Sequence, residues 1–246
     1  MSNNRDATQA TLEWYHNSYE EHGLLAQRRY PNEELLRFFG RRLFPIPPDQ
    51  RGSTRVLELG SGSCGNLWMV AREGFAAHGI DLAPQAVDLG NRVMNFWGTS
   101  AELLTGSMDD LPWPDQYFQV VFDVFSSNCL DSASFARCLK EVSRVLKPGG
   151  RYFTYTPSKR SDDFLNPGPS SMIDPCTLDG IRRADAVFAG NHYPFRFVHP
   201  LELAEKLREV DLTVDYSETL GRTYGGGRDY FEFAVVEASK ASSPNY

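Results

Sequence analysis

The spacing of apolar residues near the start of the chain predicts two helices in succession. Apolar and aromatic residues recur at helical spacings between residues 6 and 25, which predicts an amphipathic helix with an aromatic face. A second helix follows Pro31, a residue that suits the first helical position, and it ends before Pro45. The proline-rich stretch from there to Gly52 predicts a linker.

Beyond the linker, short apolar runs alternate with segments of helical period. The expected strands cover residues 54–59, 76–81, 102–105, 118–125 and 151–156, and the expected helices cover residues 66–72, 84–95 and 135–146. This alternation predicts a parallel, doubly wound sheet with helices on both faces.

The last part of the chain has a different pattern. A helix is expected at residues 200–208, followed by strands at residues 212–216 and 230–237 that a glycine-rich turn connects. Two strands joined in this way predict an antiparallel hairpin at the edge of the sheet. The expected fold class is therefore α/β, a Rossmann-like sheet of seven strands that is mostly parallel.

A long irregular segment separates the parallel strands from the hairpin. Residues 157–199 are rich in Pro, Ser, Asp and Gly. A connection of this kind inside a compact domain is usually a lid or a binding loop. We therefore expect one domain over residues 1–246, with a helical lid at residues 1–48 and a substrate-binding insertion at residues 157–199.

Composition limits the class of protein. The chain has 246 residues, 41% of them hydrophobic, so it is long enough to bury a full core and hold an active site. A net charge of −7 argues against binding along nucleic acid and favours a small-molecule partner. Four cysteines without metal-ligand spacing predict free thiols and no metal site. The lack of a signal peptide or a long apolar span predicts a cytoplasmic protein that is not bound to a membrane, and a homodimer is compatible with the sequence.

A glycine-rich turn follows the first predicted strand. Gly60, Gly62 and Gly65 let a ligand approach the backbone closely, and the helix start behind them offers N–H groups. Glu58, two residues before the first glycine, would repel a pyrophosphate and attract a cationic or hydroxyl-bearing group. Asp81 ends the next strand, where a carboxylate can accept hydrogen bonds from ribose hydroxyls. The turn therefore predicts a cofactor site.

Five motifs occur in order along the chain. They are Glu58-Leu-Gly-Ser-Gly62, Gly79-Ile-Asp81, Gly106-Ser-Met-Asp-Asp-Leu-Pro-Trp113, Phe118-Gln-Val-Val-Phe-Asp123 and Leu146-Lys-Pro-Gly-Gly150. Together they resemble the class I S-adenosylmethionine-dependent methyltransferases of the small-molecule type. The resemblance runs over residues 55–155, and the late hairpin extends it to residue 238.

The resemblance implies S-adenosyl-L-methionine as the cofactor, with S-adenosyl-L-homocysteine as its product. Gly60, Ser61 and Gly62 would bring backbone to the methionine end of the cofactor. Glu58 would lie beneath this loop, and Asp81 would hold the ribose hydroxyls.

The same resemblance implies contacts for the adenine and the ammonium group. Leu82 would lie against the adenine. Ser107 stands where many members have an Asp that meets the adenine amino group, and Met108 would offer its backbone N–H and an apolar surface. Asp123, through its carboxylate or its backbone carbonyl, would meet the ammonium group of the cofactor.

The chemistry of methyl transfer indicates which residues could act as a catalytic base on the acceptor. A hydroxyl or ammonium acceptor must lose a proton, and histidine is a usual base near neutral pH. His192 in the irregular segment is the first candidate, and His16, on a leading helix that forms a lid in many members of the family, is the second. Tyr15 accompanies His16 as a candidate cofactor contact, and Arg29 is favoured over Arg28 as a bidentate partner for the carboxylate of the cofactor.

We therefore expect an enzyme that moves a methyl group from S-adenosylmethionine to oxygen or nitrogen of a small metabolite. An NAD-dependent oxidoreductase is an alternative that the G-x-G-x-x-G spacing favours, although Glu58 and the late hairpin disfavour it. A non-catalytic module that binds S-adenosylmethionine is a second alternative. The acidic composition argues against a protein or RNA acceptor.

Overall fold

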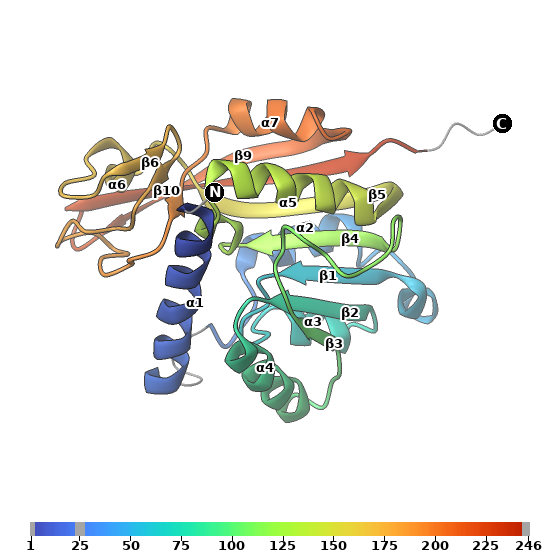
Figure 1. Cartoon of the computed structure of the whole chain (residues 1–246). Helices are drawn as coiled ribbons and strands as arrows, with labels where there is room; N and C mark the ends of the chain where they lie inside the picture. The colour runs from blue at the N-terminus through green and yellow to red at the C-terminus, as the bar shows by residue number, and fades with distance from the viewer. Residues whose placement is uncertain (1–2, 23–27, 243–246) are drawn as a thin grey trace.

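The computed structural model describes residues 3–22 and 28–242, and a seven-stranded sheet forms its centre (Figure 1). The strands follow the order β3-β2-β1-β4-β5-β10-β9. β1 to β5 pair in parallel, whereas β10 runs antiparallel to both of its neighbours, β5 and β9. The strands are β1 (Arg55–Leu59), β2 (Ala76–Asp81), β3 (Glu102–Thr105), β4 (Phe118–Val124), β5 (Leu146–Pro157), β9 (Leu212–Tyr224) and β10 (Asp229–Lys240). The predicted fold class is confirmed.

Helices cover both faces of the sheet. The α-helices are α1 (Asn3–His22), α2 (Glu33–Arg42), α3 (Leu67–Arg72), α4 (Pro84–Phe96), α5 (Ser132–Val145), α6 (Asp162–Leu165) and α7 (Pro200–Arg208). Two short 3₁₀ helices, η2 (Pro48–Ser53) and η3 (Ser127–Cys129), follow α2 and β4. In Figure 1, α5 and α7 lie on the near face of the sheet, and α2 and α3 lie behind it.

Each face of the sheet has its own hydrophobic core. On the face of α2, Phe38 stacks on Phe153 of β5 with 5.0 Å between ring centroids, and Phe39 meets Phe122 of β4 edge to face. On the opposite face, α5 and α7 bury apolar residues against Tyr152 of β5. These residues include Phe135, Leu139, Val142, Leu203 and Leu207. Two packed faces hold the parallel strands rigidly, so their carboxyl ends form a stable platform.

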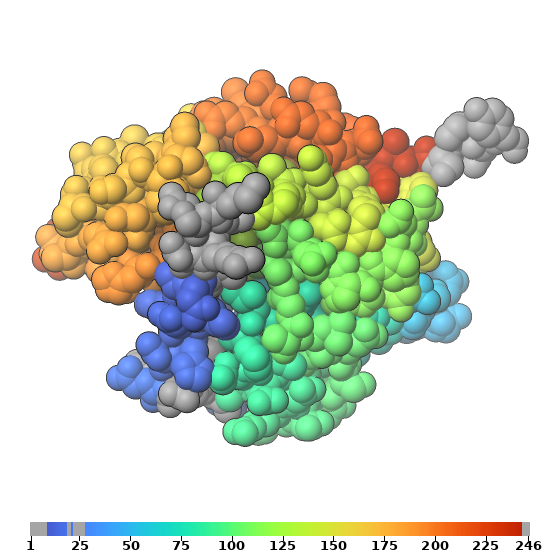
Figure 2. Space-filling model, in the orientation of Figure 1, coloured from blue at the N-terminus to red at the C-terminus, as the bar shows by residue number. Residues whose placement is uncertain are grey.

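The insertion lies beyond the carboxyl ends of the parallel strands, and α1 lies beside it (Figures 1 and 2). A small antiparallel sheet in the insertion contains β6 (Met172–Asp174), β7 (Thr177–Leu178) and β8 (Phe195–Arg196). The indole Nε1 of Trp14 in α1 donates to the carbonyl of Gly190 in the insertion at 3.3 Å. Of the two helices in the predicted lid, α1 lies beside the insertion, whereas α2 packs against the sheet. None of the described helices has the length and apolar character needed to cross a membrane.

The structure differs from the sequence predictions at several boundaries. Residues 23–25 of the first predicted helix lie outside the described residues, and η2 replaces part of the predicted linker. The hairpin is longer than predicted because β9 continues to Tyr224, which pairs with Asp229. The outer half of β9 has few buried side chains, so backbone hydrogen bonds extend the strand where no apolar pattern marks it.

Candidate functional site

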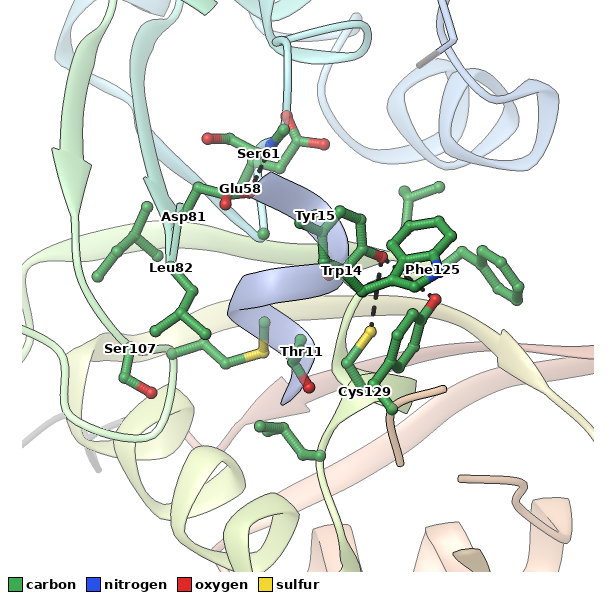
Figure 3. Close-up of a pocket in the computed structure, with 18 of the residues that line it drawn as sticks. Thr11, Trp14, Tyr15, Glu58, Ser61, Asp81, Leu82, Ser107, Phe125 and Cys129 are labelled. Carbon is green, nitrogen blue, oxygen red and sulfur yellow. Dashed lines mark hydrogen bonds between the residues drawn. The ribbon is translucent and has the colours of Figure 1, made fainter. Parts of the chain in front are cut away.

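A cavity of about 370 Å³ lies at the carboxyl ends of β1, β2 and β4, with α1 across it (Figure 3). Its wall brings together these predicted cofactor residues: Tyr15, Glu58, Gly60, Ser61, Gly62, Asp81, Leu82, Ser107 and Met108. They come from α1, from the ends of β1 and β2, and from the segments that follow β1, β2 and β3. The carboxyl edge of a parallel sheet is the usual place for a ligand in this architecture.

The glycine loop has the conformation that its sequence requires. Gly60 has a φ of 62°, in the left-handed region, and a Cβ at this position would lie 2.4 Å from the Cβ of Ser126. Gly65 packs equally closely, because a Cβ there would lie 2.3 Å from the carbonyl oxygen of Arg28. The loop therefore lies between the turn after β4 and the segment after α1, with no room for side chains at these two positions.

We expect Gly60→Ala to lower the free energy of unfolding by about 2 kcal/mol more than Gly98→Ala does. Both glycines have nearly the same φ, 62° and 63°, but nothing lies within 4 Å of a Cβ at Gly98. Gly98→Ala therefore reports the backbone strain alone, and the difference reports the clash with Ser126. Urea unfolding of the two variants measures it, and equal losses would contradict the close approach.

Asp81 connects the loop to the next strand. Its carboxylate accepts hydrogen bonds from the backbone N–H of Gly62 at 2.8 Å and of Ala83 at 3.0 Å. Burial raises the pKa of Asp81, and these two N–H groups oppose that rise. The carboxylate also lines the cavity, so it can accept hydrogen bonds from a ligand beside the loop that it orients.

Glu58 is buried beneath the loop, with 2% of its surface exposed. Its Oε1 accepts from the Nδ2 of Asn66 at 2.7 Å, and the Oδ1 of Asn66 accepts from the N–H of Asn32, the N-cap residue of α2. Its Oε2 has no hydrogen-bond partner among the described residues, nor does the hydroxyl of Ser61. Burial raises the pKa of Glu58 well above its usual range. A ligand with an ammonium or hydroxyl group here would supply the missing partner and favour the ionised carboxylate.

Another part of the wall contains Leu82 and Ser107 (Figure 3), together with Met108. The Ser107 hydroxyl donates to the carboxylate of Asp109, which also accepts from Arg137 at 2.7 Å. Asp109 lines the cavity as well, although sequence reasoning did not single it out. The position of Asp109 directly after Ser107 and Met108 could have indicated that it lines the cavity. Two apolar side chains beside a hydroxyl and a carboxylate suit a planar heterocycle with an amino group.

Asp123 does not line the cavity, so its carboxylate does not take the predicted place at the cofactor's ammonium, and the alternative contact through its backbone carbonyl stays a prediction. It is fully buried. Its carboxylate accepts from the N–H of Ser126 and Ser127, from both of their hydroxyls, and from the Thr154 hydroxyl at 3.0 Å. This set of donors occupies the carboxylate and fixes the turn after β4. Asp123 therefore holds Ser126 against the glycine loop.

The predicted bases and the predicted arginine also lie outside the cavity wall. His192 is exposed between two buried residues, Asn191 and Tyr193, which do line the cavity. His16 is half-buried on α1 and is not part of the wall. Arg29 lies over the Phe96 ring at 5.4 Å, and Arg28 takes the position at the cavity that was predicted for Arg29.

Another part of the wall is aromatic. Trp14 meets the rings of Tyr15 and Tyr193 edge to face, at 4.9 Å and 5.2 Å between centroids. Phe125 lies against Phe188 of the insertion at 4.9 Å. Sequence reasoning did not single out Phe125 or Phe188. These rings can bind an apolar molecule next to the polar loop.

Comparison with known proteins finds a family that matches part of the chain. Residues 56–150 match a family described as a methyltransferase domain. A demethylmenaquinone methyltransferase of Tropheryma whipplei is 39% identical over 98 residues, and a fatty-acid O-methyltransferase of Mycolicibacterium smegmatis is 39% identical over 107 residues. The matches cover 39% and 43% of this chain, and 38% and 37% of those relatives, so they span less than half of each protein.

A solved structure shows a similar fold over nearly the whole chain. It is the 1,6-didemethyltoxoflavin-N1-methyltransferase of Burkholderia thailandensis with bound 1,6-didemethyltoxoflavin and S-adenosylhomocysteine. The TM-score is 0.63 at 16% identity, and the match covers 98% of this chain and 92% of that one. At this identity the likeness establishes the fold, and the function must be argued from the site.

Proposed function

We propose that this chain is a class I S-adenosylmethionine-dependent methyltransferase that transfers a methyl group to oxygen or nitrogen of a small apolar molecule, because residues 56–150 match a methyltransferase domain. One observation carries the proposal. A single cavity joins the glycine loop and its two carboxylates to an aromatic wall. A polar cofactor and an apolar acceptor can therefore meet in it.

The residues around the loop fit the cofactor. Asp81 would accept hydrogen bonds from the ribose hydroxyls, and the unpartnered Oε2 of Glu58 would accept from the ammonium group. Leu82 and Met108 would enclose the adenine, with Ser107 and Asp109 near its amino group. When bound, S-adenosylmethionine supplies an electrophilic methyl group, because its positively charged sulfur leaves as a neutral thioether when an acceptor lone pair attacks the methyl carbon.

Arg28 replaces Arg29 in this proposal as the partner of the cofactor's carboxylate. It is exposed to solvent and lines the cavity beside Gly65. A guanidinium can bind a carboxylate through two parallel hydrogen bonds. The methionine end of the cofactor would then lie between Arg28 and Glu58, where its two opposite charges find complementary partners.

Glu58 argues against a dinucleotide. A pyrophosphate bound at the loop would lie beside this residue, whose carboxylate disfavours an anion, whereas Asp81 would suit the ribose of either cofactor. The NAD-dependent alternative therefore has less support than the methyltransferase.

The chain's part in the proposed reaction is to bind, orient and exclude water. Holding the acceptor in line with the transferred group can supply most of the rate enhancement. His192 and His16 lie outside the cavity wall. We therefore propose a mechanism that depends on proximity and not on a histidine base, in which the proton of a hydroxyl or ammonium acceptor is released to solvent.

His192→Ala is expected to keep kcat within about twofold of the unchanged protein. Loss of a general base would instead lower kcat by about 10²- to 10⁴-fold. His192 is exposed and lies outside the cavity wall, so its removal leaves the acceptor site intact. A hundredfold loss in kcat would restore His192 as the base.

Release of S-adenosylhomocysteine in the presence of a set of apolar phenols, enols and amines tests the proposed activity. Turnover with any of them, absent without acceptor, supports a methyltransferase. Binding of S-adenosylhomocysteine without turnover on the whole set would favour the non-catalytic module.

A further inference from the structure

Three polar side chains gather in the aromatic part of the cavity wall. The hydroxyl of Tyr15 lies 3.6 Å from the Sγ of Cys129 and 3.5 Å from the hydroxyl of Tyr193 (Figure 3). An ordinary O–H···O hydrogen bond measures roughly 2.7–2.8 Å, so the contact between the two tyrosines is long. All three residues line the cavity. A ligand oxygen placed against them could form shorter hydrogen bonds than they form with one another.

The rings around these groups favour a flat ligand. Tyr15 and Tyr193 are nearly parallel, with 5.6 Å between centroids and 28° between planes. Trp14 stands edge-on to both, and Phe125 and Phe188 add two more aromatic faces to the wall. Aromatic side chains bind planar molecules through offset stacking and edge-to-face contacts.

Charge is disfavoured in this part of the cavity. Burial raises the pKa of Tyr15 and of Tyr193, and it raises the pKa of Cys129 to about 12. The charges of Asp123 and Asp81 add to the rise at Cys129. The three groups therefore remain protonated near neutral pH. The same desolvation and the same carboxylates would oppose binding of an anionic ligand.

We propose that the methyl acceptor is an uncharged, planar molecule. An oxygen attached to its ring, a hydroxyl or a carbonyl, is held by the hydroxyls of Tyr15 and Tyr193 and the thiol of Cys129. That this ligand is a methyl acceptor rests on the proposed function. The binding site itself rests on the cluster, its distances and its aromatic surroundings.

The proposal separates two kinds of small molecule that an apolar cavity could otherwise accept. A carboxylate would bring a negative charge to a wall that lacks a cationic group in its described aromatic part, which contains Trp14, Phe125, Phe188 and the three clustered residues. An uncharged phenol or quinone would keep its oxygen hydrogen-bonded without that cost.

The probe for this test is 4-nitrophenol, because its absorbance distinguishes the phenol from the phenolate. Near its solution pKa, added protein is expected to bleach the phenolate band, since the neutral form binds better. 4-Nitrobenzoate, which places a carboxylate on the same ring, is expected to bind at least tenfold more weakly than the neutral phenol. Preferential binding of the phenolate, or equal binding of the benzoate, would overturn the proposal.

Single-atom variants locate the site. Tyr15→Phe and Tyr193→Phe keep the rings and remove the donors, and each is expected to weaken 4-nitrophenol binding about fivefold, the typical value of one neutral hydrogen bond. Tyr30→Phe is the matched control, because Tyr30 is 60% exposed and outside the cavity wall. Unchanged affinity in both cavity variants would contradict the site.

Calorimetric titration with S-adenosylhomocysteine separates this inference from the proposed function. Tyr193→Phe is expected to bind it as the unchanged protein does, because the loop, Asp81 and Tyr15 are untouched. If S-adenosylhomocysteine does not bind to any of these proteins while the preference for the neutral phenol holds, the proposed function fails and the phenol site stands.

Discussion

Asp81→Ala is expected to weaken S-adenosylhomocysteine binding by about 3 kcal/mol, more than 100-fold in Kd. A hydrogen bond to a charged group is worth about 1.5–3 kcal/mol, and the Asp81 carboxylate is proposed to accept from two ribose hydroxyls. Its loss also removes the acceptor for the N–H of Gly62, so the loop is less well ordered for the methionine end. Isothermal calorimetry on the purified variant measures the change.

Two variants separate the contact from a general effect of charge. Asp81→Asn keeps the shape and one acceptor oxygen, and its loss of affinity is expected to be smaller. Asp88→Ala removes an equal charge from an exposed position on α4 and is expected to bind normally. If Asp81→Ala bound S-adenosylhomocysteine as tightly as Asp88→Ala does, the assignment of Asp81 to the ribose would be wrong.

Asp123→Ala is expected to lower the free energy of unfolding by about 4 kcal/mol, because several buried donors would lose their acceptor. They include the N–H and hydroxyl of Ser127 and the hydroxyl of Thr154. The change also leaves the buried guanidinium of Arg196, which donates to Ser127, without its nearby negative charge. Urea unfolding, followed by circular dichroism, provides the measurement.

Asp115→Ala is the matched control for Asp123→Ala. Asp115 forms an ion pair with Arg144 at 2.9 Å, but its side chain is 74% exposed, so its loss is expected to cost about 1 kcal/mol or less. If Asp123→Ala does not fold, Asp123→Asn retains part of the network and is expected to fold with intermediate stability. A loss at Asp123 as small as that at Asp115 would contradict its role in fixing the turn.

Features that depend on local backbone geometry could be predicted from the sequence. The glycine loop and Asp81 belong to one strand-turn-helix-strand unit, whose spacing places the carboxylate beside the loop. The mostly parallel sheet and the edge hairpin likewise follow from alternating patterns and one glycine-rich turn. These predictions needed no knowledge of distant contacts.

Side-chain direction at the ends of elements could not be predicted. Asp123 turns inward because Ser126 and Ser127 present donors to it after the chain bends at Phe125, which has a φ of 58°. The two serines, three and four residues after the aspartate, are the signal that could have indicated this local network.

In the insertion, the sequence could not predict which residues face the cavity. His192 is exposed, whereas Asn191 and Tyr193 on either side of it are buried. Which residues of an extended segment face a cavity depends on how the segment docks, and the sequence of an irregular stretch does not reveal its register. Cys129 lines the cavity from η3, a short 3₁₀ helix that the pattern of apolar residues did not predict.

Calorimetric titration of the unchanged protein with S-adenosylhomocysteine and, separately, with NAD tests the central claim most directly. We expect micromolar binding of S-adenosylhomocysteine and no binding of NAD, because Glu58 favours a cationic group over a pyrophosphate at the loop. Binding of NAD without binding of S-adenosylhomocysteine would contradict the account of the loop and of both carboxylates.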